Sequence, residues 1–171
     1  DKGMMIVLIA HARIERFAEV LKALEAEHSL DLPVAAVDLR PEERTAFRKA
    51  LDGAVYELPA KKRNYLILRL DSFVSDQAAS YDSTLLTIEH VLPQTVGPGS
   101  QWEQWWPDPS ARQGWVHRLA NLVPLNRHRN SAAQNYDFDV KKDKYFKGQE
   151  KVSSYALTTQ VLSEPVWTAV V

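Results

Sequence analysis

Residues 87–94 read TIEHVLPQ, and this stretch places a carboxylate and an imidazole side by side. Residues 87–92 are apolar or β-branched apart from that pair, which predicts a short strand. Pro93 favours the end of the strand just after it. Adjacent strand residues point to opposite faces, so Glu89 and His90 share one site only if the strand twists or ends there. The stretch therefore predicts both a strand and a candidate site.

A second strand is predicted at residues 122–125, where Pro124 favours an edge position. Between the strands, residues 93–116 are rich in Pro and Gly, which predicts a loop. Four of the five tryptophans lie in that loop, so we expect it to be packed against the protein; stacking of one Trp on a base is the alternative. After the second strand, NRHRNSAAQN (126–135) predicts the start of a helix, with Asn126 as its cap.

The first 80 residues predict helices over 4–28, 41–52 and 60–76, because apolar residues recur there at helical spacing. Pro41 is well placed to begin the second of these helices. We therefore predict a mostly helical α+β fold. A helical connector would occupy residues 1–81, and a second domain with the two strands would occupy residues 82–171.

The composition restricts the possible functions. There are no cysteines, which excludes disulfides and cysteine-rich zinc sites and fits a reducing cytosol. The apolar run near the start is far shorter than the roughly 20 residues that span a bilayer. The net charge is −1, yet residues 111–151 hold nine Lys or Arg and four Asp or Glu, which indicates a localised anionic partner. The chain begins with Asp1, so we expect a fragment of a longer protein.

Glu89-His90, Asn121 and Asn130 follow one another in the predicted order strand, strand, helix. Phosphodiester hydrolysis needs a neutral imidazole that takes a proton from water, and a hard divalent ion that neutralises charge on the phosphate. A glutamate carboxylate and an asparagine carbonyl are oxygen ligands for such an ion. The flanking phosphates would be held by nearby basic residues, namely Arg127, Arg129, Lys141, Lys142 and Lys144.

Two other interpretations stay open from the residues alone. His90 could cap a loop while the asparagines serve turns. Alternatively, nitrogen and oxygen ligands for zinc could come from Glu89, His90, His117 and His128, although their spacing matches no compact zinc motif.

The blocks IEHVLPQ, RLANLVPLNRHRNSAAQN and FDVKKDKY, in this order, resemble the HNH (ββα-metal, or His-Me finger) nuclease family. The resemblance is closest to the C-terminal nuclease domain of GmrSD-type modification-dependent restriction enzymes and of the phosphorothioate-sensing SspE antiphage protein. The HNH domain of RNA-guided CRISPR nucleases is similar too, with two asparagines nine residues apart, as Asn121 and Asn130 are here. The resemblance covers roughly residues 65–167.

The resemblance implies a role for each residue of the set. His90 would be the general base that activates water. Glu89 and Asn130 would bind one Mg²⁺ or Mn²⁺ ion, with His128 as the fallback ligand. Asn121 would orient His90 and brace the hairpin loop, and residues 127–144 would contact DNA phosphates. Ala120 departs from the family pattern, which usually has Gly there.

The resemblance further implies a DNA endonuclease that nicks double-stranded phage DNA in a bacterial antiphage or restriction system of the cytoplasm. Relatives carry an N-terminal NTPase or sensor domain. This chain has no P-loop, so we expect no nucleotide cofactor in it. One alternative is a catalytically inactive nucleic-acid-binding module with an HNH-like fold. Another is a partner-docking domain built on residues 1–80.

Overall fold

The computed structural model of the chain describes residues 2–26, 41–75, 86–126, 135–147 and 155–169. The chain divides into two compact units, Asp1–Arg48 and Lys49–Val171. Each unit is described by itself below. Among the described residues, no helix has both the length and the apolar character needed to cross a membrane.

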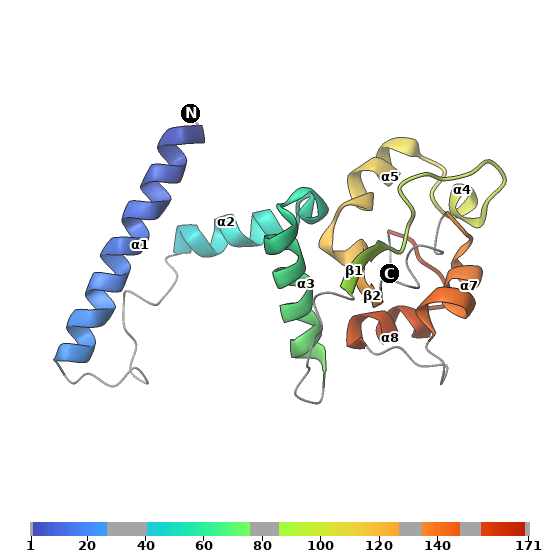
Figure 1. The fold of residues 1–171 in the computed structure, drawn as a ribbon. Coiled ribbons are helices and arrows are strands. Elements are labelled where there is room, and N and C mark those ends of the chain that lie inside the picture. Colours follow the sequence, from blue (N-terminus) through green and yellow to red (C-terminus); the bar gives the residue numbers. More distant parts are fainter. Residues whose placement is uncertain (1, 27–40, 76–85, 127–134, 148–154, 170–171) are drawn as a thin grey trace. The chain divides into compact units, whose positions relative to one another are not determined.

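The first unit contains helix α1 (Lys2–Glu25) and most of helix α2 (Pro41–Leu51) (Figure 1). Both helices agree with the predictions to within a few residues. Pro41 begins α2 as expected, and Glu42 and Glu43 in its first turn suit the positive end of the helix dipole. Arg16 of α1 forms an ion pair with Glu43 at 2.6 Å.

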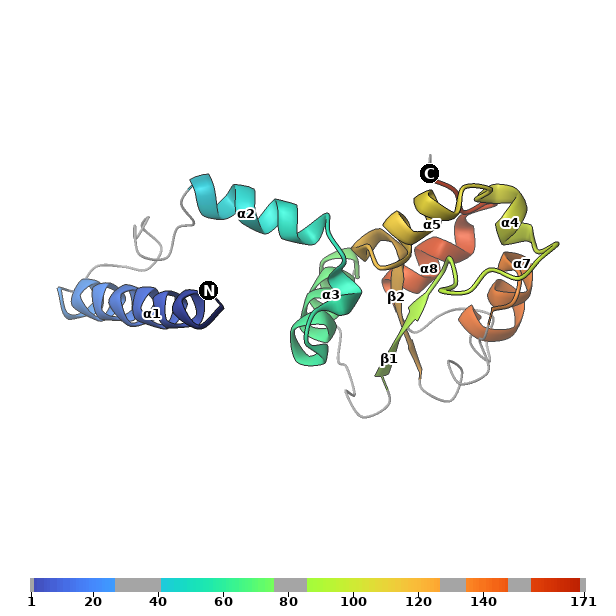
Figure 2. The same ribbon diagram turned by 90° about the horizontal axis from the view of Figure 1, so that it is seen from above.

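The second unit is built around a two-stranded antiparallel sheet (Figure 2). Strand β1 spans Leu86–His90 and strand β2 spans Leu122–Asn126, which confirms both predicted strands. The register pairs Leu86 with Asn126 and His90 with Leu122. His90 is thus the last residue of β1, directly opposite the first residue of β2.

One side of the sheet is covered by helix α3 (Ala60–Val74) and by the short 3₁₀ helix η1 (Val55–Glu57), and helix α8 (Ala156–Ser163) contacts both α3 and β2. The fully buried Ile67 packs there with apolar residues of η1 and both strands. The buried Asp71 of α3 accepts a hydrogen bond from the backbone N–H of Leu157 at 2.8 Å. Helix α3 therefore packs with the strands, and the boundary predicted at residues 81/82 falls inside this unit.

The segment predicted as a loop, 93–116, contains two short helices, α4 (Gln101–Trp105) and α5 (Pro109–Val116). Each begins at a side-chain cap. Ser100 accepts a hydrogen bond from the backbone N–H of Glu103, and Asp108 accepts one from that of Ser110. The prediction of an irregular segment is thus wrong for these helices, since their caps outweigh the Pro and Gly content around them.

The tryptophans of this segment are packed, as predicted. Trp102 is fully buried and Trp106 is nearly so, in a second core with Phe138 and Phe146. Helix α7 (Phe138–Lys141) and the π-helical turn η3 (Lys142–Phe146) supply those phenylalanines. The indole N–H of Trp102 donates to the carbonyl of Tyr136 at 2.8 Å. Residues 127–134, most of the stretch predicted to start a helix, lie outside the described residues.

Candidate active site

His90 lies at the end of β1 with its ring enclosed by three side chains. Its Nε2 is 3.2 Å from Nδ1 of His117, and its Nδ1 is 3.4 Å from the side-chain nitrogen of Gln94. The ring of Tyr56 lies 4.1 Å away between centroids, in an edge arrangement. Only 5% of the His90 surface is exposed. The imidazole is therefore contacted at both nitrogens, and the Tyr56 ring packs against it.

This environment keeps the imidazole neutral. Burial lowers the pKa of His90 to about 3, and electrostatic interactions with His117, Lys141 and Arg63 act in the same direction. If the amide of Gln94 donates to Nδ1, the ring proton resides on Nε2 and is donated to His117. Nδ1 then carries the lone pair. Because Gln94 is exposed, water can replace it at that nitrogen.

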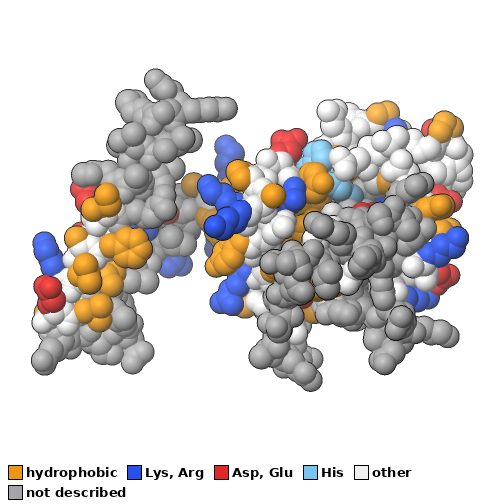
Figure 3. All heavy atoms as spheres, viewed as in Figure 1, with side chains coloured by type: hydrophobic (Ala, Val, Ile, Leu, Met, Phe, Trp, Pro, Cys, Tyr) orange, Lys and Arg blue, Asp and Glu red, His pale blue; other side chains and the backbone are white. Residues whose placement is uncertain are grey.

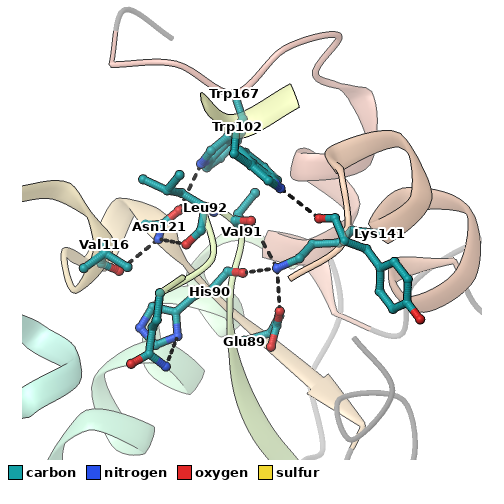
Figure 4. A network of polar contacts seen from close by, with 11 residues as sticks. Glu89, His90, Val91, Leu92, Trp102, Val116, Asn121, Lys141 and Trp167 are labelled. Carbon is teal, nitrogen blue, oxygen red and sulfur yellow. Dashed lines mark hydrogen bonds and ion pairs between the residues drawn. The ribbon is translucent and has the colours of Figure 1, made fainter. Parts of the chain in front are cut away.

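Asn121 braces the loop that follows His90. It is the last residue of the 3₁₀ helix η2 (Leu119–Asn121) and is 2% exposed. Its amide oxygen accepts from the backbone N–H of Leu92 at 2.7 Å, and its amide nitrogen donates to the carbonyls of Leu92 and Val116, both at 2.9 Å. The indole of Trp167 adds a bond of 3.1 Å to the same oxygen (Figure 4).

The brace therefore reaches His90 through the backbone. The backbone carbonyl of Asn121 also accepts from the N–H of Val91, the residue next to His90. Among the described residues no hydrogen bond joins the Asn121 side chain to the His90 ring itself. Asn121 fixes where the strand ends, and this sets the position of the ring.

Glu89 points away from His90, toward the opposite side of β1 (Figure 4). Its Oε1 accepts a hydrogen bond from Nζ of the fully buried Lys141 at 2.8 Å. The same ammonium donates to the carbonyls of His90 at 2.7 Å and Val91 at 3.3 Å. The expectation that the strand end turns Glu89 and His90 toward one point is not met, because both residues keep the alternating geometry of a strand.

Burial and ion pairing act in opposite directions on this pair. Burial raises the pKa of Glu89 and lowers the pKa of Lys141, while the attraction between the two charges opposes both shifts. Three oxygens converge on the Lys141 ammonium. The end of β1 therefore already holds one cation, supplied by α7.

Glu89 fits one ligand position of a hard divalent ion. Carboxylate oxygens are what Mg²⁺ prefers, and Oε1 is the oxygen that Lys141 occupies, which leaves Oε2 for the ion. In the part of the chain that the structure describes, no three His, Cys, Asp or Glu side chains gather as a metal-binding group. The zinc site considered above therefore has no cluster among the described residues. Asn130 and His128, the other predicted ligands, lie outside the described residues.

The predicted phosphate contacts divide into three groups. Arg127 and Arg129 lie outside the described residues. Lys142 is half-buried and donates to the carbonyl of Glu164 at 3.0 Å, whereas Lys144 is exposed. Lys141 was expected to bind DNA phosphate, and this is corrected: its ammonium is 0% exposed and is bonded to Glu89 and two backbone carbonyls.

Tyr56 and Gln94 contact His90 but were not predicted as site residues, and His117 was considered only as a zinc ligand. Tyr56 lies in a segment in which no catalytic residue was expected, and its ring stacks on His117 at 5.4 Å between centroids. Gln94 was part of the opening stretch, but nothing in its spacing indicated contact with the imidazole. Only the fold brings Tyr56 and His117 together, through the backbone bond from the N–H of Tyr56 to the carbonyl of His117.

The antiparallel strand pair thus ends in a buried histidine, with the Asn121 brace just before the second strand. The family model for the C-terminal domain of GmrSD restriction endonucleases matches residues 42–171. The chain therefore belongs to that family. It is a nuclease domain of restriction-endonuclease type, and DNA is the substrate of that class. Such endonucleases generally use divalent metal ions. No curated protein matches the chain.

Proposed function

We propose that this domain is a divalent-metal-dependent DNA endonuclease of the HNH type, with His90 as its general base. The observation that carries the proposal is the neutral, enclosed imidazole at the end of β1, fixed by the Asn121 brace. A general base must be unprotonated at the working pH and must be held within reach of the water that it activates. His90 meets the first condition, and the exposed Gln94 leaves a route for water to meet the second.

The proposed step begins when a water molecule replaces Gln94 at Nδ1 of His90. Nδ1 takes one proton from the water, and the water oxygen forms a bond to phosphorus while the bond to the leaving sugar oxygen breaks. That oxygen then takes a proton from solvent. The phosphate anion beside His90 favours the imidazolium and raises the pKa of His90 from about 3 toward the working range.

In this proposal one Mg²⁺ or Mn²⁺ ion is held by Glu89 and Asn130, with His128 as the fallback ligand. When bound, it neutralises charge that develops on the phosphate and the leaving oxygen. Lys142, Lys144, Arg127 and Arg129 would bind phosphates along the DNA backbone. We propose no nucleotide cofactor for this chain.

The biological setting belongs to the same proposal. One HNH site cuts one strand, so we expect nicks in double-stranded DNA. We further propose antiphage restriction in the bacterial cytoplasm, controlled by an N-terminal NTPase or sensor domain of the full-length chain. Residues 1–81 would act as the helical connector to that domain, with η1 and α3 at its end also packed on the sheet. The support for this setting is the family match.

The test is relaxation of a supercoiled plasmid in Mg²⁺ or Mn²⁺. We expect the wild type to nick, and His90→Ala to nick about 10²- to 10⁴-fold more slowly, as is typical on loss of a general base. His28→Ala, which removes a histidine from the first unit, is the matched control and should nick normally. Circular dichroism shows whether each variant is folded. Equal nicking rates of wild type and His90→Ala would contradict the proposal.

A second candidate is a DNA-binding module that has lost catalysis. The observation that favours it is the Lys141–Glu89 pair, since Lys141 already neutralises the carboxylate expected to hold the metal. Salt-dependent DNA binding by the wild type, with no nicking in any divalent metal, would establish this alternative.

A further inference from the structure

A polar groove of about 470 Å³ lies beside His90, between residues 93–96 and helix α5. It is lined by Pro93, Gln94, Thr95, Val96, Pro109, Arg112, Gln113, Val116 and His117. Gln94 and His117, the two side chains that contact the ring nitrogens of His90, both belong to this lining. The groove is therefore bordered by the two side chains that contact the imidazole. Figure 3 shows histidine atoms in pale blue reaching the surface in this part of the molecule.

Arg112 supplies the positive charge of the groove. Its Nη1 is buried and, in the part of the chain that the structure describes, has no hydrogen-bond partner. Buried polar nitrogens nearly always have a partner, so the unpaired Nη1 of this groove-lining arginine indicates a ligand that completes its hydrogen bonds. None of the nine lining residues is acidic. The missing partner is therefore an anion or acceptor brought by the ligand.

Other arginines nearby have partners, which sets Arg112 apart. Arg118 donates to the carbonyl of Gly114 and forms an ion pair with Asp52 at 3.3 Å. Arg63 donates to the carbonyl of Tyr56 at 3.2 Å and lies over the Tyr56 ring. The planar fork of a guanidinium matches the oxygens of a phosphate. The amides of Gln94 and Gln113 and the hydroxyl of Thr95 can donate to further phosphate oxygens.

We propose that this groove binds a backbone phosphate of the DNA strand next to the phosphodiester that His90 acts on, with Arg112 as the principal contact. The inference rests on the proposed nuclease function, because that function makes DNA backbone the ligand beside His90. It adds a phosphate site on α5, separate from the basic residues after β2. Arg112 positions the strand and takes no part in bond cleavage.

The test measures binding of a short fluorescent DNA duplex by anisotropy, in the His90→Ala background so that cutting does not interfere. Arg112→Gln should weaken binding about ten- to a hundredfold. It should also reduce the slope of log affinity against log salt by about 0.9, the value for one lost phosphate contact. Arg69→Gln is the matched control, since it removes an exposed arginine of α3 that lies outside the groove. It should leave both quantities unchanged.

A second variant tests the groove independently, in case Arg112→Gln does not fold. Thr95 is exposed, so Thr95→Glu places a carboxylate in the groove without disturbing the core. It should weaken DNA binding by repulsion, with an unchanged melting temperature. In the nicking assay, Arg112→Gln should raise KM more than it lowers kcat, as expected for a positioning residue.

The outcomes separate this inference from the proposed function. If binding depends on Arg112 but the wild type never nicks, the phosphate site stands and the nuclease proposal fails. If the wild type nicks while Arg112→Gln and Thr95→Glu both bind DNA like the wild type, the phosphate site is overturned and the nuclease proposal stands.

Discussion

Glu89 and His90 are adjacent in the sequence, and burial disfavours the charged form of both, but the two residues avoid this cost in different ways. The carboxylate of Glu89 is paired with the ammonium of Lys141 at 2.8 Å, whereas His90 avoids the cost of a buried charge by staying neutral. A charge removed from water is costly unless it is paired. Each residue therefore gives a different response to substitution or to pH.

Replacing Lys141 tests the buried ion pair. Lys141→Met leaves the Glu89 carboxylate buried without its partner, so we expect the free energy of unfolding to fall by about 3–5 kcal/mol. Adding Glu89→Gln to this variant should restore part of the loss, because the unpaired charge is then gone. Urea denaturation of the wild type and of the single and double variants measures this. A loss of less than about 1 kcal/mol in Lys141→Met would contradict the pairing.

His90 makes stability depend on pH. The folded-state pKa of His90 is about 3, while an unfolded histidine titrates near 6.5. Between these values the unfolded chain binds the extra proton, so the His90 contribution is complete above pH 6.5 and is lost as the pH falls toward 3. The wild type should therefore lose stability relative to His90→Gln by up to about 1.4 kcal/mol per pH unit in this window. Urea denaturation at pH 7, 6, 5 and 4 measures the difference, and a difference independent of pH would refute the shift.

At this scale the sequence predicts candidate site residues but not which of their atoms meet. His90 and Asn121 were selected from short motifs, and the structure places both at the end of β1. Lys141 was assigned to phosphate because it belongs to the basic stretch that follows the second strand. Its burial depends on contacts with residues about 50 positions away, which local patterns do not contain.

Some helices and strands are determined by local sequence patterns, whereas others depend on caps and tertiary packing. The long helices and the two short strands follow from apolar periodicity and β-branched residues, so they were predicted. Helices α4 and α5 are only five and eight residues long, and each depends on one capping side chain, Ser100 or Asp108. Helices this short are decided by caps and tertiary packing. The Pro and Gly content of residues 93–116 therefore predicted a loop where α4 and α5 form.

Asp71 joins α3 to α8, and this link can be tested. Asp71→Ala leaves the N–H of Leu157 without its acceptor, so we expect a loss of about 1–3 kcal/mol in the free energy of unfolding. Faster hydrogen exchange at the start of α8 should accompany it. Asp71→Asn keeps an acceptor oxygen and is the matched control, with a smaller loss. Equal effects of the two variants would show that the charge, and not the hydrogen bond, is what matters.

At the scale of the whole molecule, the division into two units predicts which truncated proteins still fold. The unit Lys49–Val171 contains Val55, Ile67 and Asp71 as buried residues, so the sheet cannot be covered without η1 and α3. Helix α2 has no buried residues.

We therefore expect deletion of residues 1–48 to leave a folded domain with a cooperative melt close to that of the full chain. Deletion of residues 1–80 should abolish the melt, because it exposes the apolar face of the sheet. Circular dichroism and size-exclusion chromatography of the two truncated proteins measure this. A folded protein lacking residues 1–80 would show that α3 is dispensable, as expected of a simple connector.

The bond from Trp167 to Asn121 has a consequence for the order in which the molecule is completed. The indole that steadies the brace is made 46 residues after the asparagine that it contacts. At about 5–20 residues per second, a ribosome takes roughly 2–9 seconds to cover that distance. During this interval His90 and β2 have been synthesised, but the brace lacks one of its partners. A nascent chain thus carries its histidine before it carries a finished site, and translation itself delays the moment at which the domain becomes competent.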